Sequence, residues 1–304
     1  MDLNKLKREG VPITMLTAHD YPSARFIESA SAVAADVDVA RLSPEDRKAL
    51  NFRRGVDICL VGDSLAMVAL GYASTTSLSL DEMLYHCRAV ARGCATSLLV
   101  ADLPFGTFGA SVEQGVRSAM RLIQEGNMDA VKIEGGREIA PLVKALAALG
   151  IPVMGHGGLT PQRQAALSGF RVQGKSAASA QRVVDDLLAL EDAGAFALLV
   201  EAVPVPLGAY IARRAKVPTI GIGAGPGTSG QVLVQLDMMG VNSLHGAGPK
   251  FLKRYGRMEE MAVGAIREYV GEVREGAFPE AVRHGYPVAE DEWAKIEAAL
   301  DGQK

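Results

Sequence analysis

Residues with ionisable or hydroxyl side chains recur in this sequence at one kind of position, the end of a short apolar run. The run 58–61 is followed closely by Asp63 and Ser64, and the run 98–102 ends in Asp102. In parallel α/β folds the ends of the strands form the mouth of the ligand site. We therefore expect one site to gather the side chains at these strand ends, which are Asp63, Ser64, Asp102, Lys132, Glu134, His156 and Glu201.

These residue types predict a metal-assisted reaction on an anionic carbonyl compound. Carboxylates from three strands can converge on one hard cation, and Mg²⁺ prefers one or two carboxylates together with water and substrate oxygens. Lys132 would pair with an anionic substrate, which leaves Glu201 free to act as a base. The set indicates either proton abstraction next to a carbonyl or carbon–carbon bond chemistry.

Each of these residues also has a simpler interpretation. Asp63 and Ser64 could cap the helix that follows them, and His156 is as well explained by a structural hydrogen bond as by catalysis. Ionisable residues at several consecutive strand ends are harder to explain in this way, because each one needs a charge partner or water there. The joint pattern therefore favours a functional site.

The elements that must position these residues form an alternating pattern. Apolar strand-like runs lie at 12–17, 58–61, 98–102, 130–134, 151–154, 196–200, 218–222 and 232–235, and helical segments separate them. The pattern is typical of a (β/α)₈ TIM barrel, with a doubly wound open sheet as the alternative. We expect a single barrel domain over 1–304, with a surface insertion at about 36–54 and extra C-terminal helices after about 257.

Composition excludes several classes of function. The 304 residues are 48% hydrophobic and 5% aromatic, with a net charge of -3 and no basic patch, which argues against a nucleic-acid partner. We expect no membrane partner, since the chain opens without a secretory signal and contains no apolar run of spanning length. Its three cysteines lack CxxC spacing, which disfavours a disulfide or zinc site and suits a reducing cytoplasm.

The sequence resembles the ketopantoate hydroxymethyltransferase family in motifs that follow in unbroken order between Ile13 and Tyr255. The matching stretches lie at 60–65, 99–105, 131–136, 158–162, 172–174, 201–204, 220–225 and 249–251. The resemblance implies a (β/α)₈ barrel, dependence on Mg²⁺ and a homo-oligomer, typically a decamer. The reaction it implies is hydroxymethyl transfer from 5,10-methylenetetrahydrofolate to 3-methyl-2-oxobutanoate through a Mg-chelated enolate, giving 2-dehydropantoate for pantothenate synthesis.

The resemblance also implies roles for individual residues. Asp63 and Asp102 match the metal ligands, which also contact the oxoacid, and Glu134 matches an acid that often reaches the metal through water. Ser64 and Lys132 match the residues that bind the oxoacid. Glu201 matches the general base. Independently of the resemblance, we expect His156 to support the site from behind these residues.

The chain departs from the family pattern mainly in predicted loops. Its unusual residues are His19, Ala66, Gly157 and Leu236, where the family usually has Tyr, Gly, Leu and His, together with the segment 73–77 and the longer segment 36–54. None of these departures removes a proposed metal ligand or the base. They bear on substrate preference and folate contacts more than on the reaction class.

Two alternative functions remain compatible with the residues. The first is a Mg²⁺-dependent lyase or mutase of the phosphoenolpyruvate mutase and isocitrate lyase type. Lyases of that group carry a catalytic Cys in a loop that here reads Met154 to Gly158 without one, which counts against this alternative. The second is a paralogue that binds the oxoacid without turnover.

Overall fold

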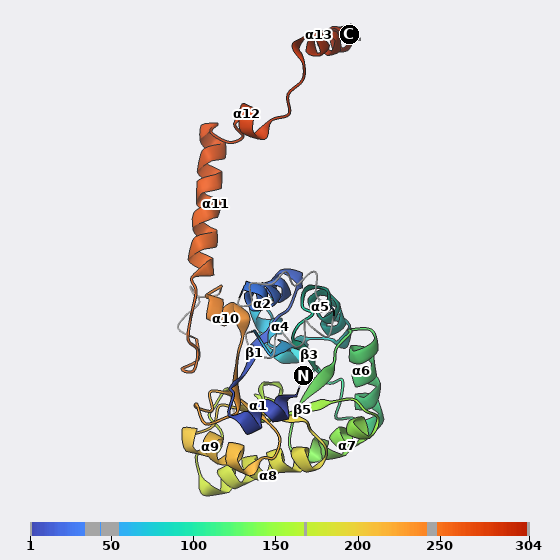
Figure 1. The fold of residues 1–304 in the computed structure, drawn as a ribbon, viewed down its shortest axis with the longest axis vertical. Coiled ribbons are helices and arrows are strands. Elements are labelled where there is room, and N and C mark those ends of the chain that lie inside the picture. Colours follow the sequence, from blue (N-terminus) through green and yellow to red (C-terminus); the bar gives the residue numbers. More distant parts are fainter. Residues whose placement is uncertain (1, 34–42, 44–54, 167–168, 242–247, 303–304) are drawn as a thin grey trace. The chain divides into compact units, whose positions relative to one another are not determined.

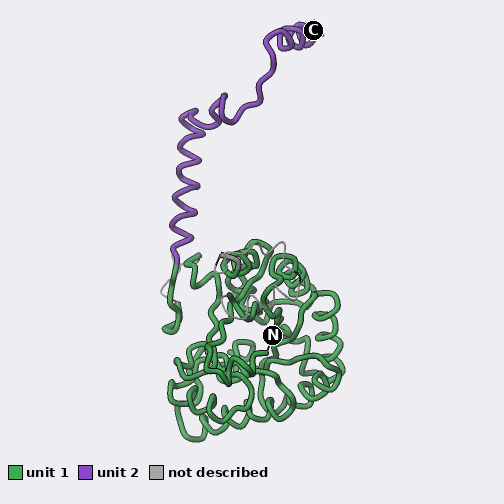
Figure 2. The backbone as a smooth tube through the Cα atoms, in the orientation of Figure 1, with its two compact units in different colours: residues 1–255 green, residues 256–304 purple. Residues whose placement is uncertain are grey.

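The structure is a computed structural model, and it describes residues 2–33, 43, 55–166, 169–241 and 248–302. The chain divides into two compact units, residues 1–255 and 256–304 (Figure 2). Among the described residues, the first unit contains all of the strands and the second contains three helices. The insertion expected at 36–54 lies outside the described residues, apart from Ser43.

Eight parallel strands close into a barrel in the order in which they occur along the chain. They are β1 (Ile13–Thr17), β2 (Ile58–Val61), β3 (Leu98–Asp102), β4 (Ala130–Glu134), β5 (Val153–Gly158), β6 (Ala197–Glu201), β7 (Thr219–Ile222) and β8 (Gly230–Leu233). Because β1 pairs with both β2 and β8, the sheet has no edges. The predicted (β/α)₈ barrel is confirmed, and the alternative of a doubly wound open sheet is wrong.

Helices surround the strands in a ring (Figure 1). The longer ones are α2 (Tyr21–Val33), α5 (Leu80–Gly93), α6 (Val112–Gln124), α7 (Ala140–Ala148), α8 (Ala177–Asp192) and α9 (Val205–Arg214). Serines begin three of them: Ser79, Ser111 and Ser176 each accept a hydrogen bond from the first turn of α5, α6 and α8. These side chains satisfy backbone N–H groups that have no partner within the helix.

Short helices fill the remaining connections of the first unit. They are α1 (Leu3–Glu9), α4 (Leu65–Val68), η2 (Thr75–Ser77), η3 (Arg137–Ile139), η4 (Pro161–Arg163) and α10 (Gln235–Met239). Helix α1 packs Leu3 and Leu6 against the apolar residues inside the barrel, among them Ile13 and Ile58 at the first positions of their strands. Lys7 of α1 also donates hydrogen bonds to the carbonyls of Ala215 and Val217. Helix α1 therefore covers the amino-terminal end of the barrel.

The strands are buried on both faces, as their continuous apolar runs predict. In β2, Cys59 and Val61 pack in the layer between strands and helices, whereas Ile58 and Leu60 point into the barrel. Cys59, Cys87 and Cys94 are all buried and free. Cys59 is thus a small core residue.

The last strand lies earlier than the sequence pattern predicts. The prediction at 232–235 was wrong in its bounds, because β8 begins at Gly230 and Gln235 already opens α10. A Cβ at residue 230 would lie 2.3 Å from the carbonyl oxygen of Ile13, so this approach of β8 to β1 requires glycine. Glycine gives no apolar pattern, which explains why the start of the strand was missed.

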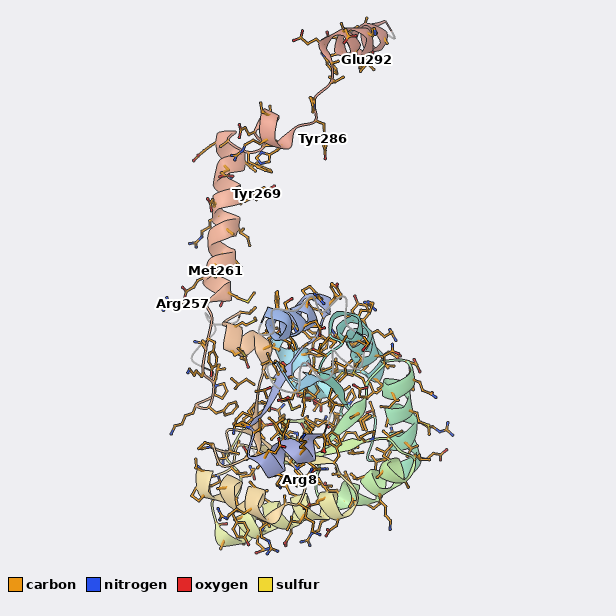
Figure 3. All side chains as sticks on the ribbon, in the orientation of Figure 1. Arg8, Arg257, Met261, Tyr269, Tyr286 and Glu292 are labelled. Atoms are coloured by element: carbon orange, nitrogen blue, oxygen red, sulfur yellow. The ribbon has the colours of Figure 1, made fainter. Side chains whose placement is uncertain are left out.

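The second unit consists of α11 (Met258–Glu275), α12 (Ala281–His284) and α13 (Glu290–Asp301). None of its helices buries a residue, and large side chains such as Met261 and Tyr269 stand out from α11 (Figure 3). Among the described residues, no helix has the length and apolar character needed to cross a membrane.

Candidate active site

The residues singled out in the sequence lie in, or directly after, five neighbouring strands, β2 to β6. The strand register pairs Asp102 with Lys132, Glu134 with His156, and Gly158 with Glu201. Side chains alternate along a strand, so Lys132 and Glu134, two residues apart, lie on the same face of β4. The structure therefore gathers these side chains at the carboxyl-terminal end of the barrel.

Asp63, Asp102 and Lys132 form a buried charged group. The Asp63 backbone N–H donates to one oxygen of the Asp102 carboxylate at 2.9 Å, and the Lys132 ammonium forms an ion pair with the other. Burial and the neighbouring Asp102 raise the pKa of Asp63 well above its usual value. Burial alone would lower the pKa of Lys132, but the surrounding carboxylates outweigh that effect and raise it. The group thus combines one ammonium group with two carboxyl groups.

His156 connects two further carboxylates. Its Nε2 lies 3.1 Å from an oxygen of Glu201, and its Nδ1 lies 3.4 Å from an oxygen of Glu134. Burial and the Lys132 charge oppose protonation of the ring, but the two carboxylates prevail and raise the pKa of His156 to about 9. His156 therefore lies against Glu201, the predicted base, an arrangement that a structural role and a catalytic role share.

Gln162 is a member of the site that the search for chemically active residues missed. Its backbone N–H donates to Glu134 at 3.0 Å, and its side-chain amide donates to Asp63 at 2.8 Å and to the Leu103 carbonyl at 3.0 Å. It lies in η4, within the 158–162 stretch, and is only 5% exposed. A buried amide carries no charge to draw notice, and only its place in that motif could have pointed to it.

The interpretation of Asp63 and Ser64 as helix caps is not supported. The side chain of Asp63 accepts from Gln162, and Ser64 precedes α4 without a side-chain hydrogen bond to its first turn. Both residues instead line the cavity described next.

A cavity of about 530 Å³ brings the predicted residues into one space. It is lined by all seven of them, namely Asp63, Ser64, Asp102, Lys132, Glu134, His156 and Glu201. The rest of its wall is largely apolar, with Phe170 and Val172 from the segment after β5, Phe251 and Leu252 from the segment 248–255, and Leu199 from β6. A concave apolar site with a few convergent polar groups is the usual form of a small-molecule site.

Tight backbone packing holds Glu201 at the cavity. Gly158 at the end of β5 has φ +91°, and a Cβ there would lie 2.3 Å from the Glu201 carbonyl oxygen. Ala202, which follows Glu201, adopts a left-handed φ of 47°, a conformation that is unfavourable for residues other than glycine. The Ala202 N–H donates to Ile222 and its carbonyl accepts from Gln173, so neighbouring segments hold this conformation.

Among the described residues, no three His, Cys, Asp or Glu side chains are placed as a ready-made metal-ligand set. The oxygens of Asp102 already face Lys132 and the Asp63 N–H. One oxygen of Glu134 is buried and accepts no hydrogen bond.

Comparison with known sequences identifies relatives over nearly the whole chain. A model of the ketopantoate hydroxymethyltransferase family matches residues 48–281. The 3-methyl-2-oxobutanoate hydroxymethyltransferase of Emericella nidulans is 46% identical over 98% of this chain and 78% of its own length. That of Oleidesulfovibrio alaskensis is 48% identical over 95% of this chain and 91% of its own length.

Solved structures share the fold at low sequence identity. A phosphonopyruvate hydrolase in complex with oxalate and Mg²⁺ has a TM-score of 0.54 at 18% identity, with 99% of this chain and 95% of that chain covered. Phosphoenolpyruvate phosphomutase from Streptomyces platensis subsp. rosaceus has a TM-score of 0.55 at 15% identity, with 99% and 96% covered. At such identity the likeness concerns the barrel alone.

Proposed function

The chain belongs to the ketopantoate hydroxymethyltransferase family of transferase enzymes, and from this we propose that it transfers a hydroxymethyl group from 5,10-methylenetetrahydrofolate to 3-methyl-2-oxobutanoate. The product is 2-dehydropantoate, a precursor of pantothenate. The observation that carries the proposal is the position of Glu201. Its carboxylate reaches the cavity that Lys132 and Asp63 also line, and His156 lies 3.1 Å from it.

Lys132 and Ser64 are suited to bind the oxoacid. The oxoacid carries a carboxylate beside a keto group, and the Lys132 ammonium supplies the complementary positive charge. Burial strengthens this attraction, because the ammonium is only 4% exposed and its field is weakly screened. The Ser64 hydroxyl makes no capping bond to α4 and is available to the substrate oxygens.

The residues at the site also fit a divalent cation. Asp63, Asp102 and Glu134 bring three buried carboxylates together. Burial, and after it the neighbouring carboxylates, raise the pKa of Asp63, and a bound cation would offset both effects. We propose that Asp63 and Asp102 hold a Mg²⁺ ion and that Glu134 approaches it. When bound, the ion would polarise the keto oxygen and stabilise negative charge on it.

Glu201 is proposed as the general base. It would remove the proton from C3 of the oxoacid, so that the electron pair of the C–H bond moves into an enolate stabilised by the Lys132 charge. The methylene carbon is bonded to two nitrogens of the folate. One carbon–nitrogen bond breaks as C3 bonds to that carbon, and the second breaks as water adds to it. The two nitrogens take up the proton removed from C3 and one proton from the water, and tetrahydrofolate leaves. Water supplies the oxygen of the new hydroxyl group.

We further propose that the enzyme works as a homo-oligomer in the cytoplasm. Helix α11 carries exposed apolar side chains, and none of its residues is buried. Exposed apolar surface of this kind marks an interaction site. Three free buried thiols accord with a reducing compartment.

Proton exchange tests the function without the folate. Wild-type protein with Mg²⁺ in D₂O should exchange the C3 proton of 3-methyl-2-oxobutanoate, and Glu201→Gln should reduce the rate by about 10²- to 10⁴-fold, because a positioned base contributes that much. NMR follows the loss of the C3 proton signal. Glu113→Gln, at an exposed site on α6 paired with Arg117, is the control and should exchange like the wild type.

The outcomes separate the alternatives. Exchange that persists in Glu201→Gln would remove Glu201 as the base. Wild-type protein that binds the oxoacid without exchange would indicate a paralogue without turnover. Exchange without transfer on addition of methylenetetrahydrofolate would favour a lyase or mutase.

A further inference from the structure

The cavity is larger than the oxoacid requires. At about 530 Å³ it falls within the range of roughly 300–1,000 Å³ that encloses drug-sized ligands, whereas the oxoacid has a five-carbon skeleton. The charged residues from β2 to β6 account for the oxoacid, which leaves the wall formed by Phe170, Phe251 and α10 without an assigned ligand. The inference below rests on the proposed function, since it concerns where the folate donor lies.

One acidic residue on this second wall is not used by the oxoacid site. Asp237 lies in α10, directly after β8, and lines the cavity. Burial raises its pKa, partly offset by the charge of Arg254, and its carboxylate accepts no hydrogen bond from the described residues. Partial burial removes some of the water that would solvate this carboxylate. Hydrogen bonds from the N–H groups of a ligand would replace that hydration.

We propose that the carboxylate of Asp237 binds the pterin ring of the folate donor through the ring N–H and the neighbouring amino group. These two groups lie side by side and both donate, so they match the two oxygens of one carboxylate, as a guanidinium does. An amide in place of Asp237 would present an N–H to one of the donors. The pterin would therefore bind more tightly to a carboxylate than to an amide at this position.

The surrounding side chains suit the rest of the folate. Phe251 packs against Gly223, where a Cβ would lie 2.7 Å from the ring, so the backbone of the turn after β7 fixes the position of Phe251. A fixed aromatic ring offers a face to the flat pterin. Lys250 precedes it, is exposed and lines the same cavity, and it matches the negatively charged glutamyl end.

Isothermal titration with tetrahydrofolate tests this contact. Against full-length protein with Mg²⁺, Asp237→Asn should weaken binding by about 10- to 100-fold, as expected for hydrogen bonds to a charged group. An analogue without the 2-amino group should bind the wild type and Asp237→Asn with nearly equal affinity, because the analogue cannot make the full contact. Asp192→Asn, an exposed acid on α8 away from the cavity, should bind like the wild type.

Equal affinity of wild type and Asp237→Asn for tetrahydrofolate would overturn the inference, and so would an equal loss with both ligands. Circular dichroism checks folding, and Asp237→Ser serves as a second variant with the same expected loss if Asp237→Asn does not fold. Proton exchange of the oxoacid by the wild type needs no folate. If the wild type exchanges the proton but the wild type and Asp237→Asn bind tetrahydrofolate equally, this inference alone is overturned. If the wild type does not exchange the proton, the proposed function is overturned.

Discussion

Gln162 shows that an uncharged residue organises the charged cluster. It contacts Asp63 through its side chain and Glu134 through its backbone, so one residue positions carboxylates from two strands. Its side-chain amide also donates to the Leu103 carbonyl, and this hydrogen bond offsets the loss of hydration on burial. We expect its amide to act by fixing the orientation of Asp63 rather than by touching the substrate.

Replacing Gln162 with Leu should slow exchange of the C3 proton by about 10- to 100-fold, because it removes a hydrogen bond to the buried Asp63 carboxylate. It should also raise the Mg²⁺ concentration needed for half-maximal exchange, since Asp63 is no longer held in place. The measurement is a Mg²⁺ titration of the exchange rate by NMR.

Gln164→Leu is a matched control for this change. Gln164 follows the same η4 helix, but its amide donates to Ser74 and makes no contact with the carboxylates. We expect it to leave the Mg²⁺ titration unchanged. Equal shifts in the two variants would mean that Gln162 acts only through the general packing of this segment.

At the scale of elements, the ends of β5 and β6 can approach closely because Gly158 has no side chain. A Cβ there would lie 2.3 Å from the Glu201 carbonyl oxygen, and the backbone is left-handed. Gly158→Ala should therefore displace the end of β6 and lower both the exchange rate and the melting temperature. The loss of stability should exceed the 1–2 kcal/mol that a left-handed backbone alone costs.

Gly150→Ala isolates the cost of the backbone conformation. Gly150 has φ +79°, and nothing lies within 4 Å of a Cβ built there. Thermal unfolding should show a loss of about 1–2 kcal/mol for this variant with normal exchange. If Gly158→Ala were no less stable and no less active than Gly150→Ala, the close approach would not matter to the site.

The elements also show what the sequence can and cannot predict. The runs 58–61, 98–102 and 130–134 match β2, β3 and β4, because strands buried on both faces leave continuous apolar patterns. The start of β8 was missed since Gly230 has no side chain to contribute. The contacts of His156 with Glu134 and Glu201 depend on the register between separate strands, which no local pattern records.

At the scale of the whole molecule, the proposed homo-oligomer can be tested on the second unit. Ile266, Tyr269, Val270 and Val273 follow a helical spacing on α11, and all are exposed. Ile266→Asp should reduce the size of the homo-oligomer, because it places a charge in a surface that would be buried between copies. Size-exclusion chromatography with light scattering measures the mass.

The control is a charge change away from this apolar stripe. Glu268 lies two residues from Ile266, on another side of α11, and Glu268→Lys should leave the mass unchanged. A wild-type protein that is monomeric at micromolar concentration, or Ile266→Asp with the wild-type mass, would contradict the assignment of this surface.

The covering of the barrel by α1 has a consequence for the order of events in catalysis. Among the described residues, apolar side chains fill the interior between α1 and the site, so ligands would reach the cavity from the carboxyl-terminal end. In the proposed reaction the oxoacid would bind to groups at the strand ends, and a folate on the wall of α10 and Phe251 would lie across its exit. The reaction would then follow a compulsory sequence, in which the small substrate enters first and the small product departs last.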